Sequence, residues 1–273
     1  MSAPARSYLF VPGNRPERFA KAEAAGADAL IIDLEDAVPP AQKGAAREAA
    51  SAWLAAGHRA FVRVNGADSG CFEEDLQLGD LPGLEGFAVP KAERPEALAA
   101  AASRLSGAGV LLPIIETAAG FARADRLAAA PRVRRLMFGS IDFQVDLGIE
   151  GEGEELLYFR SSLVLVSRLA GLERPVDGVS TGLDDEAALQ RDAARSRRLG
   201  FGGKLCIHPR QVPAVNRCFQ PSAEESAWAR RVIAAAEAAG GAAVSVDGRM
   251  VDRPVLLKAE QILAAVAAFG EPL

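Results

Sequence analysis

The sequence contains few of the side chains that bind soft metal ions. Among 273 residues there are two histidines, His58 and His208, and three cysteines, Cys71, Cys206 and Cys218. No two cysteines are spaced as C-x-x-C, so a zinc site built from cysteine and histidine is nearly excluded. Any metal must therefore be held mainly by oxygen ligands, and a general base is expected to be a carboxylate. The cysteines show no charged neighbour that would favour a thiolate, and we interpret all three as structural.

Excess positive charge and long apolar runs are absent as well. The chain has 31 lysines and arginines against 36 aspartates and glutamates, a net charge of -5, which argues against nucleic acid as a partner. No apolar run approaches the ~18 residues that a membrane helix needs, and the start of the chain lacks a signal-peptide pattern. We therefore expect a cytoplasmic protein with reduced thiols and no membrane contact.

The sequence does contain a regular alternation of short β-branched runs with longer Ala-rich stretches of helical period. The predicted strands are 7–11, 29–34, 60–64, 86–89, 110–115, 135–138, 176–179 and 203–207. The predicted helices are 15–25, 41–56, 95–105, 120–129, 155–170, 184–199 and 222–239. Eight such units in about 250 residues match the (β/α)8, or TIM, barrel. An open doubly wound sheet is the alternative, but no G-x-G-x-x-G follows the first strand.

The residues after the eighth unit form a separate pattern. Residues 244–251 alternate around Asp247-Gly248, which indicates a hairpin, and Pro254 opens an apolar-striped helix over 255–269. No Ser- or Gly-rich linker precedes them. We therefore expect one domain, in which residues 1–243 form the catalytic barrel and residues 244–273 form a hairpin-plus-helix extension that acts as a lid or an oligomer contact.

Carboxylates follow three of the predicted strands, where the active sites of barrels lie. Asp33 lies at the end of the second strand, Glu35 and Asp36 follow it, and Glu116 and Asp142 follow the fifth and sixth strands. Carboxylates gathered at one rim favour a shared divalent cation, and Glu116 and Asp142 could hold Mg2+ together with water and substrate oxygens. Each carboxylate taken alone could equally be the N-cap of the next helix.

Two other polar side chains have alternative interpretations. Arg63, on the third strand, could face an anionic substrate or a developing oxyanion. It could equally neutralise Asp33 or Glu35 in a structural role. His208 follows the eighth strand and precedes Pro209, a context that favours a loop hydrogen bond over a catalytic base.

Basic side chains gather in the first loop. Arg15, Arg18 and Lys21 stand at the start of the first predicted helix, where backbone N–H groups also favour anions. They could hold a phosphorylated carrier such as coenzyme A, and a solvated basic helix face explains the spacing as well. The glycine-rich stretch 200–204 lacks the hydroxyl residue of a phosphate-binding P-loop, since Leu205 stands in that position.

Several segments in the same order along the chain identify a family. They are SYLFVPGNRPERF (7–19), DLEDAV (33–38), VRVN (62–65), PKAE (90–93), IET (115–117), GSIDF (139–143), CIHP (206–209) and GRMVD (248–252). With these segments the chain resembles the CitE-like family, which includes the citrate lyase beta subunit and malyl-CoA and citramalyl-CoA lyases and belongs to the HpcH/HpaI aldolase superfamily. The resemblance covers nearly the whole chain.

The resemblance implies a Mg2+-dependent (β/α)8 barrel that assembles as a homotrimer or hexamer. By motif, Glu116 and Asp142 would be the metal ligands and Arg63 would contact substrate. The catalytic acid/base aspartate of the acyl-CoA lyases, which enters a neighbouring subunit's site, corresponds to Asp252, although that residue also stands where it could cap a helix. The residues that would touch substrate or its carrier are Phe10, Arg15, Lys21, Ile207 and His208.

The function expected from these residues and the resemblance is carbon-carbon bond cleavage. The substrate would be a hydroxyacyl-CoA thioester of the citramalyl-, malyl- or hydroxymethylglutaryl-CoA type, and the products an acetyl-type thioester and a 2-oxo acid. One alternative is a citrate lyase beta subunit that cleaves citryl-acyl-carrier-protein to acetyl-carrier and oxaloacetate. Another is a non-catalytic metal- and anion-binding barrel subunit.

Overall fold

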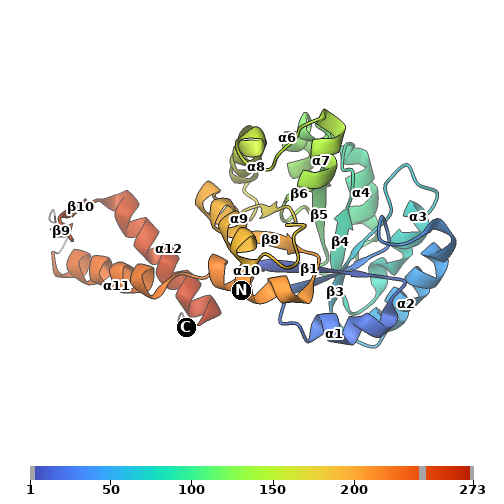
Figure 1. Cartoon of the computed structure of the whole chain (residues 1–273), viewed down its shortest axis with the longest axis horizontal. Coiled ribbons are helices and arrows are strands. Elements are labelled where there is room, and N and C mark those ends of the chain that lie inside the picture. Colours follow the sequence, from blue (N-terminus) through green and yellow to red (C-terminus); the bar gives the residue numbers. More distant parts are fainter. Residues whose placement is uncertain (1–3, 240–243, 271–273) are drawn as a thin grey trace. The chain divides into compact units, whose positions relative to one another are not determined.

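Eight parallel strands close into a barrel in chain order, in a computed structural model that describes residues 4–239 and 244–270 (Figure 1). The strands are β1 (Ser7–Pro12), β2 (Ala29–Asp33), β3 (Ala60–Arg63), β4 (Leu84–Val89), β5 (Val110–Ile115), β6 (Met137–Phe138), β7 (Val176–Asp177) and β8 (Gly203–Cys206). Pairing of Ser7 with Lys204 joins β8 to β1 and closes the barrel. The predicted TIM barrel is confirmed.

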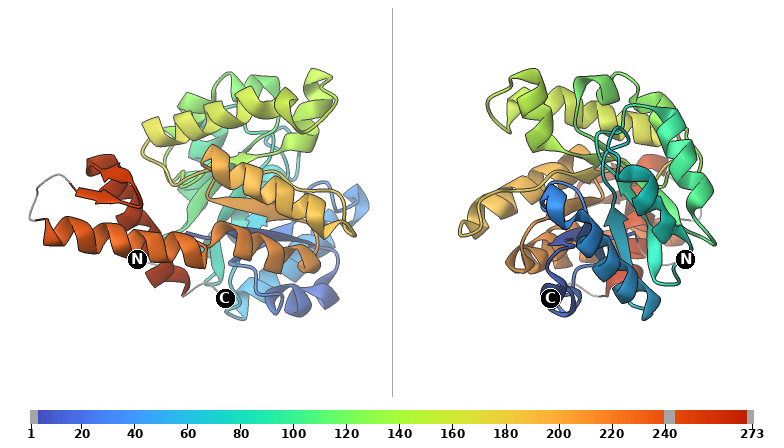
Figure 2. Two further views of the ribbon diagram at one scale, coloured as in Figure 1. Left: turned by 60° about the vertical axis from the view of Figure 1, so that its left-hand side comes forward. Right: turned by 90° about the vertical axis from the view of Figure 1, so that its right-hand side faces the viewer.

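Helices surround the barrel as Figures 1 and 2 show. They are α1 (Phe19–Glu23), α2 (Lys43–Ala55), α3 (Phe72–Asp75), α4 (Pro95–Arg104), α5 (Ala118–Phe121), α6 (Ala124–Ala128), α7 (Ser140–Leu147), α8 (Leu157–Leu169), α9 (Glu186–Leu199) and α10 (Val212–Phe219). The 3-10 helices are η1 (Pro16–Arg18), η2 (Pro40–Gln42), η3 (Leu76–Asp80), η4 (Glu154–Leu156) and η5 (Pro209–Gln211). The sequence did not predict α3, α7 and α10, because helical period becomes detectable over windows of about 11–18 residues.

Apolar side chains fill the barrel interior up to the carboxyl ends of the strands. They come from all eight strands and are Tyr8, Ala29, Ile31, Phe61, Ala88, Leu112, Ile114, Met137, Val176 and Leu205. Successive side chains of a strand point to opposite faces, so residues two positions further along also point inward. The barrel interior is therefore packed with apolar side chains below the carboxyl ends of the strands. At those ends, the remaining inward-pointing positions can carry polar side chains.

The chain from Arg217 onward forms a second compact unit, distinct from Ala5–Asn216. It contains α11 (Ala223–Ala238), β9 (Val244–Val246), β10 (Arg249–Val251) and α12 (Arg253–Phe269). The predicted hairpin is confirmed, and positive φ angles of 51° at Asp247 and 74° at Gly248 fit a type I′ turn.

The predicted boundary between residues 243 and 244 differs from this division, which falls between Asn216 and Arg217. The physical reason is packing: Ala229 and Val232 of α11 and Ala259 of α12 form a small buried core of their own. Helix α11, predicted as the last helix of the barrel, therefore belongs with the C-terminal unit. Within the described residues, no helix has the length and apolar character needed to cross a bilayer.

Candidate active site

The strand alternation brings the predicted site residues to the carboxyl end of the barrel. Each follows an inward core residue of a strand by two positions along the chain: Phe10 after Tyr8, Asp33 after Ile31, Arg63 after Phe61, Glu116 after Ile114 and Ile207 after Leu205. All five line one cavity of about 470 Å3, together with Asp142 from α7. The structure therefore unites the predicted metal pair, the predicted substrate arginine and two of the predicted contact residues.

Glu116 is a buried carboxylate that faces this cavity, with 2% of its surface exposed. Its Oε1 accepts a hydrogen bond of 2.6 Å from the backbone N–H of Lys91. Gly139 leaves room for the carboxylate, since a Cβ there would overlap Glu116. Burial is the largest cause that raises the pKa of Glu116, which reaches about 8, and the charges of Glu35 and Asp142 raise it further. The hydrogen bond from the Lys91 N–H and the charge of Arg63 lower it, but by less. The site thus favours an additional positive charge beside Glu116.

Arg63 is fixed by carboxylates of the second strand and its loop. Its Nε and Nη2 donate to the two oxygens of Asp33 at 2.7 and 2.6 Å, and Nη1 lies 3.0 Å from Glu35 Oε2. The guanidinium also lies 5.0 Å from the ring centre of Phe10. Burial opposes the charge of Arg63, but Asp33, Glu35 and Glu116 outweigh it and raise its pKa. The structural alternative for Arg63 is thus observed, and a guanidinium has five N–H donors, so others remain for a ligand in the cavity.

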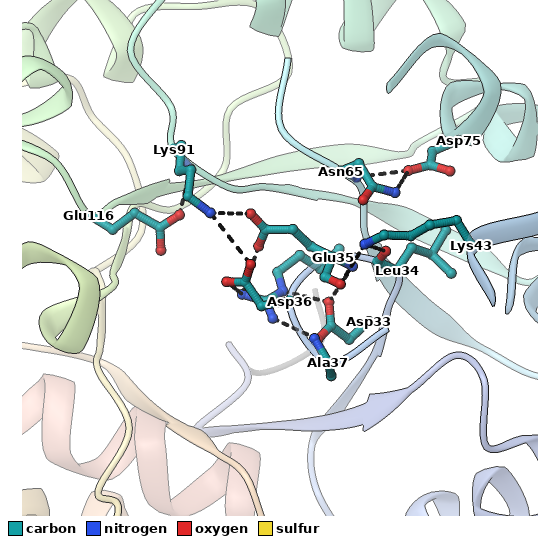
Figure 3. Close-up of polar contacts among 11 residues, drawn as sticks. Asp33, Leu34, Glu35, Asp36, Ala37, Lys43, Asn65, Asp75, Lys91 and Glu116 are labelled. Carbon is teal, nitrogen blue, oxygen red and sulfur yellow. Dashed lines mark hydrogen bonds and ion pairs between the residues drawn. The ribbon is translucent and has the colours of Figure 1, made fainter. Parts of the chain in front are cut away.

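Lys91 is a site residue to which the sequence assigned no role. Figure 3 shows Lys91 between Glu116 on one side and Glu35 and Asp36 on the other. Its backbone N–H donates to Glu116, and its ammonium pairs with Glu35 and lies 3.7 Å from Asp36. Its φ of 44° is a left-handed conformation that is strained for a side chain other than glycine. The signal available in the sequence was its place directly after the fourth strand. Lys91 thus orients a predicted metal ligand through its backbone and neutralises Glu35 through its side chain.

The carboxyl end of the barrel, with the cavity described above, is called the mouth below. The carboxylate oxygens at the mouth suit Mg2+. Asp142 lies in the first turn of α7 and makes no cap for that helix, whereas Thr117, the neighbour of Glu116, caps α5 through Gly120 N–H at 3.0 Å. Both carboxylates are therefore free of the capping role weighed for them. Across residues 4–239 and 244–270 no three or more Asp, Glu, His or Cys side chains converge as metal ligands. Two carboxylates suit Mg2+, which keeps several waters and binds substrate oxygens.

The remaining predicted contact residues lie outside the lining of this cavity. Arg15 and Lys21 are exposed, before η1 and on α1 respectively. His208 forms the predicted loop hydrogen bond, with its Nδ1 accepting from Arg210 N–H at 3.1 Å, and Gln211 completes a capping box at η5. Nδ1 as acceptor places the proton of the neutral ring on Nε2.

Asp252 lies in the C-terminal unit and caps a helix. Its carboxylate accepts a 3.1 Å hydrogen bond from Val255 N–H at the start of α12, and its side chain is exposed. The capping alternative is thus observed, and its proton-transfer role stays a prediction. Cys71 and Cys206 are free thiols, and burial raises the pKa of Cys206 to about 12.

Comparisons with known proteins identify similar sequences and similar structures. Residues 6–209 match the model of the HpcH/HpaI aldolase/citrate lyase family. A citrate lyase subunit beta-like protein of Deinococcus radiodurans is 41% identical over 275 residues, covering 95% of this chain and 96% of that protein. A (3S)-malyl-CoA thioesterase of Cereibacter sphaeroides is 36% identical, covering 97% of each chain. The crystal structure of CitE from Mycobacterium tuberculosis with magnesium, acetoacetate and coenzyme A has a TM-score of 0.85 and 34% identity, covering 98% of this chain and 100% of that chain.

Proposed function

The chain belongs to the HpcH/HpaI aldolase/citrate lyase family, and on that premise we propose that it is a Mg2+-dependent carbon-carbon lyase. It would cleave a hydroxyacyl-CoA thioester of the malyl or citramalyl type into an acetyl thioester and a 2-oxo acid. The observation that carries the proposal is the cavity that Glu116, Asp142 and Arg63 share. It presents two oxygen ligands and a fixed cation to a substrate that carries a hydroxyl and a carboxylate.

The residues of the mouth would divide the chemistry among them. Glu116 and Asp142 would hold Mg2+, which when bound polarises the hydroxyl and carboxylate oxygens of the substrate and lowers the hydroxyl pKa. Arg63 would use its remaining N–H donors to hold the carboxylate of the 2-oxo acid portion. Lys91 and Asp33 would keep Glu116 and Arg63 in place, because each already binds its partner.

Asp252 is the proposed acid/base group. Its carboxylate would take the proton of the substrate hydroxyl, which becomes the keto group of the 2-oxo acid as the carbon-carbon bond breaks. The electron pair of that bond passes to the acetyl thioester as an enolate, and Asp252 would then deliver the proton to the acetyl carbon. Asp252→Asn separates this role from helix capping, since Asn caps about as well as Asp. The variant should keep its melting temperature and lose cleavage. Unchanged cleavage would remove Asp252 from the mechanism.

The test of the proposed reaction is a product analysis with malyl-CoA and citramalyl-CoA, each with Mg2+ and with EDTA. Lyase activity releases glyoxylate or pyruvate in step with acetyl-CoA, and no free thiol. The expected result is 2-oxo acid formation that EDTA abolishes. Formation of neither product from either thioester would overturn the CoA-lyase proposal.

Two candidate variations are supported by the relatives. The similarity to a (3S)-malyl-CoA thioesterase favours hydrolysis as a second candidate, and the same assay separates it, since hydrolysis gives free CoA thiol and a hydroxy acid. The similarity to a citrate lyase subunit beta of Leuconostoc mesenteroides, 34% identical over 278 residues, favours a carrier-bound citryl substrate. Activity that appears with citryl-acyl-carrier-protein and with neither CoA thioester would select that variation.

A further inference from the structure

The side chains that line the cavity at the mouth are separated by charge around the barrel. The charged ones come from β2 and β3 and from the segments that follow β2, β5 and β6; they are Asp33, Asp36, Arg63, Glu116 and Asp142. Strands β7, β8 and β1 are neighbours in the barrel, because β8 pairs with both of the others. These three strands and the residues just after them supply an uncharged part of the lining: Phe10, Pro12, Val179, Thr181, Leu205 and Ile207. The mouth therefore has a charged arc and, beside it, an arc in which the exposed Thr181 is the polar member and the others are apolar.

This apolar arc, formed by Phe10, Pro12, Val179, Leu205 and Ile207, is continuous with the packed interior of the barrel. Leu205 belongs to the apolar core, and Phe10 and Val179 pack against it. Ile207 continues the arc outward and is 42% exposed. Removing apolar surface from water is favourable, whereas burying a carboxylate without a partner is costly. The arc therefore favours an apolar substrate group and opposes a charged one.

The positive charge of the lining lies on the opposite, charged arc. Among the described residues that line the cavity, Arg63 is the single cation, and its Nε and Nη2 donate to Asp33 at 2.7 and 2.6 Å. The proposed Mg2+ ligands, Glu116 and Asp142, belong to the same arc. This arc can therefore hold one carboxylate and the hydroxyl of the proposed substrate. A second carboxylate would lie against the apolar arc or face carboxylates of its own sign.

We propose that the apolar arc selects a substrate whose 2-oxo acid portion carries an uncharged alkyl group, as in pyruvate or 2-oxobutyrate. The inference rests on the proposed lyase function and narrows its substrate. The carbon that bears the hydroxyl also carries the carboxylate, the acyl thioester arm and one substituent that stays with the 2-oxo acid. When the charged arc holds the hydroxyl and the carboxylate, this substituent lies against the apolar arc. It is a methyl in a citramalyl thioester, a hydrogen in a malyl thioester and a carboxymethyl group in a citryl thioester.

Calorimetric titration of the full chain with 2-oxo acids, in excess Mg2+, tests this selection without requiring turnover. 2-Oxobutyrate and oxaloacetate are a matched pair, since a terminal methyl in one is a carboxylate in the other. We expect oxaloacetate to bind at least about 100-fold more weakly than 2-oxobutyrate. We also expect glyoxylate, which lacks the methyl of pyruvate, to bind about 10-fold more weakly than pyruvate.

The possible results separate this inference from the proposed function. Oxaloacetate that binds as tightly as 2-oxobutyrate would overturn the selection by the apolar arc and leave the lyase proposal standing. Glyoxylate that binds as tightly as pyruvate would likewise show that the substituent does not lie against the arc. If no 2-oxo acid binds in the presence of Mg2+, both the selection and the lyase function are wrong.

A cation placed on the apolar arc should reverse the preference. Ile207→Arg should raise the affinity for oxaloacetate by about 10-fold or more and lower that for 2-oxobutyrate. Leu183→Arg is the matched control, because Leu183 is 43% exposed and follows β7 at the same end of the barrel but does not line the cavity. It should leave the ratio of the two affinities unchanged. An unchanged ratio in Ile207→Arg, or an equal change in both variants, would contradict the proposal, and the titration of the wild type tests it even if a variant folds poorly.

Discussion

Two groups of polar and charged side chains, each built around buried carboxylates, lie on opposite faces of the barrel sheet. The mouth cluster, inside the barrel end, consists of Asp33, Glu35, Arg63, Lys91 and Glu116. The wall cluster, between the sheet and helices α8 and α9, consists of Arg160, Asp177, Ser196 and Lys204. Both are built on strand residues, and both remove carboxylates from water. They differ in the cations and hydrogen-bond donors that surround each buried carboxylate.

In the wall cluster the central carboxylate is fully matched. Asp177 accepts from Arg160 Nε at 3.0 Å, from Gly178 N–H at 2.9 Å and from the Ser196 hydroxyl. Burial alone would raise the pKa of Asp177, but Lys204, Arg160 and Ser196 outweigh it and lower that pKa. Burial lowers the pKa of Lys204, which donates to Gly178 O at 2.7 Å. The cluster is complete without a ligand.

In the mouth cluster the negative charge exceeds what the two cations neutralise. Arg63 and Lys91 are already engaged by Asp33 and Glu35, and the pKa of Glu35 is nevertheless raised by burial. Glu116 receives a backbone N–H but no ion pair from the described part of the chain. Similar burial therefore gives opposite pKa directions for Glu116 and Asp177. The difference distinguishes a charge that stabilises the fold from one that is held ready for a cation.

Neutralising Glu116 tests most strongly whether its charge serves a cation and not the fold. Glu116→Gln should lower kcat for the proposed cleavage by about 10^3-fold, or ~4 kcal/mol, because Mg2+ loses a ligand. In EDTA its free energy of unfolding should equal or exceed that of the wild type, since the raised pKa of Glu116 means that folding must either bury an unmatched carboxylate or protonate it, and Gln removes that cost. Mg2+ should raise the melting temperature of the wild type and not of the variant. A kcat within tenfold of wild type would contradict the assigned role.

The matched substitution in the wall cluster should behave in the opposite way. Asp177→Asn leaves Arg160 and Lys204 buried without their counter-charge, and should lower the free energy of unfolding by about 3–5 kcal/mol. Its kcat per folded molecule should stay near the wild-type value, because Asp177 does not face the cavity. Urea unfolding and kcat measured on the same preparation check both expectations. A loss of kcat without a loss of stability would mean that the two clusters are coupled.

Lys91 sharpens the comparison within the mouth cluster. Lys91→Met removes the ammonium that neutralises Glu35, whose charge acts on the proposed metal ligand Glu116, and should lower kcat/KM by about 10- to 100-fold. Lys91→Gly removes the same charge but adopts a φ of 44° without strain. It should therefore show a similar kcat/KM and be more stable than Lys91→Met by about 1 kcal/mol. Equal stability of the two variants in urea would show that the backbone conformation carries no strain.

The sequence predicted those parts of the molecule that follow from periodicity. The eight strands, the barrel and the mouth position of Glu116, Asp142 and Arg63 came from alternation and strand ends. Contacts between residues distant in sequence were not predictable. The pairing of Lys91 with Glu35 spans 56 positions, and the hydrogen bonds of Asp177 depend on how α8 and α9 pack on the sheet. The boundary of the C-terminal unit was missed for the same reason, since α11 follows the barrel pattern but packs on α12.

Cys206 provides the smallest and most specific test of the wall side of the sheet. It lies two residues after Lys204 on the same outward face of β8, and burial raises its pKa from 9.0 to about 12. A group whose pKa is higher in the folded state loses its stabilising contribution as pH rises above the pKa in the unfolded state. Between pH 8 and pH 10 the wild type should therefore lose about 1.4 kcal/mol more of its free energy of unfolding than Cys206→Ala, since the unfolded thiol ionises and the folded one does not. Comparing each protein with itself at the two pH values removes the constant effect of the smaller side chain. Equal losses in the two proteins would show that the Cys206 thiol ionises in the folded barrel as readily as in water. Water would then reach the outward face of β8 despite the burial of Cys206 in the structure.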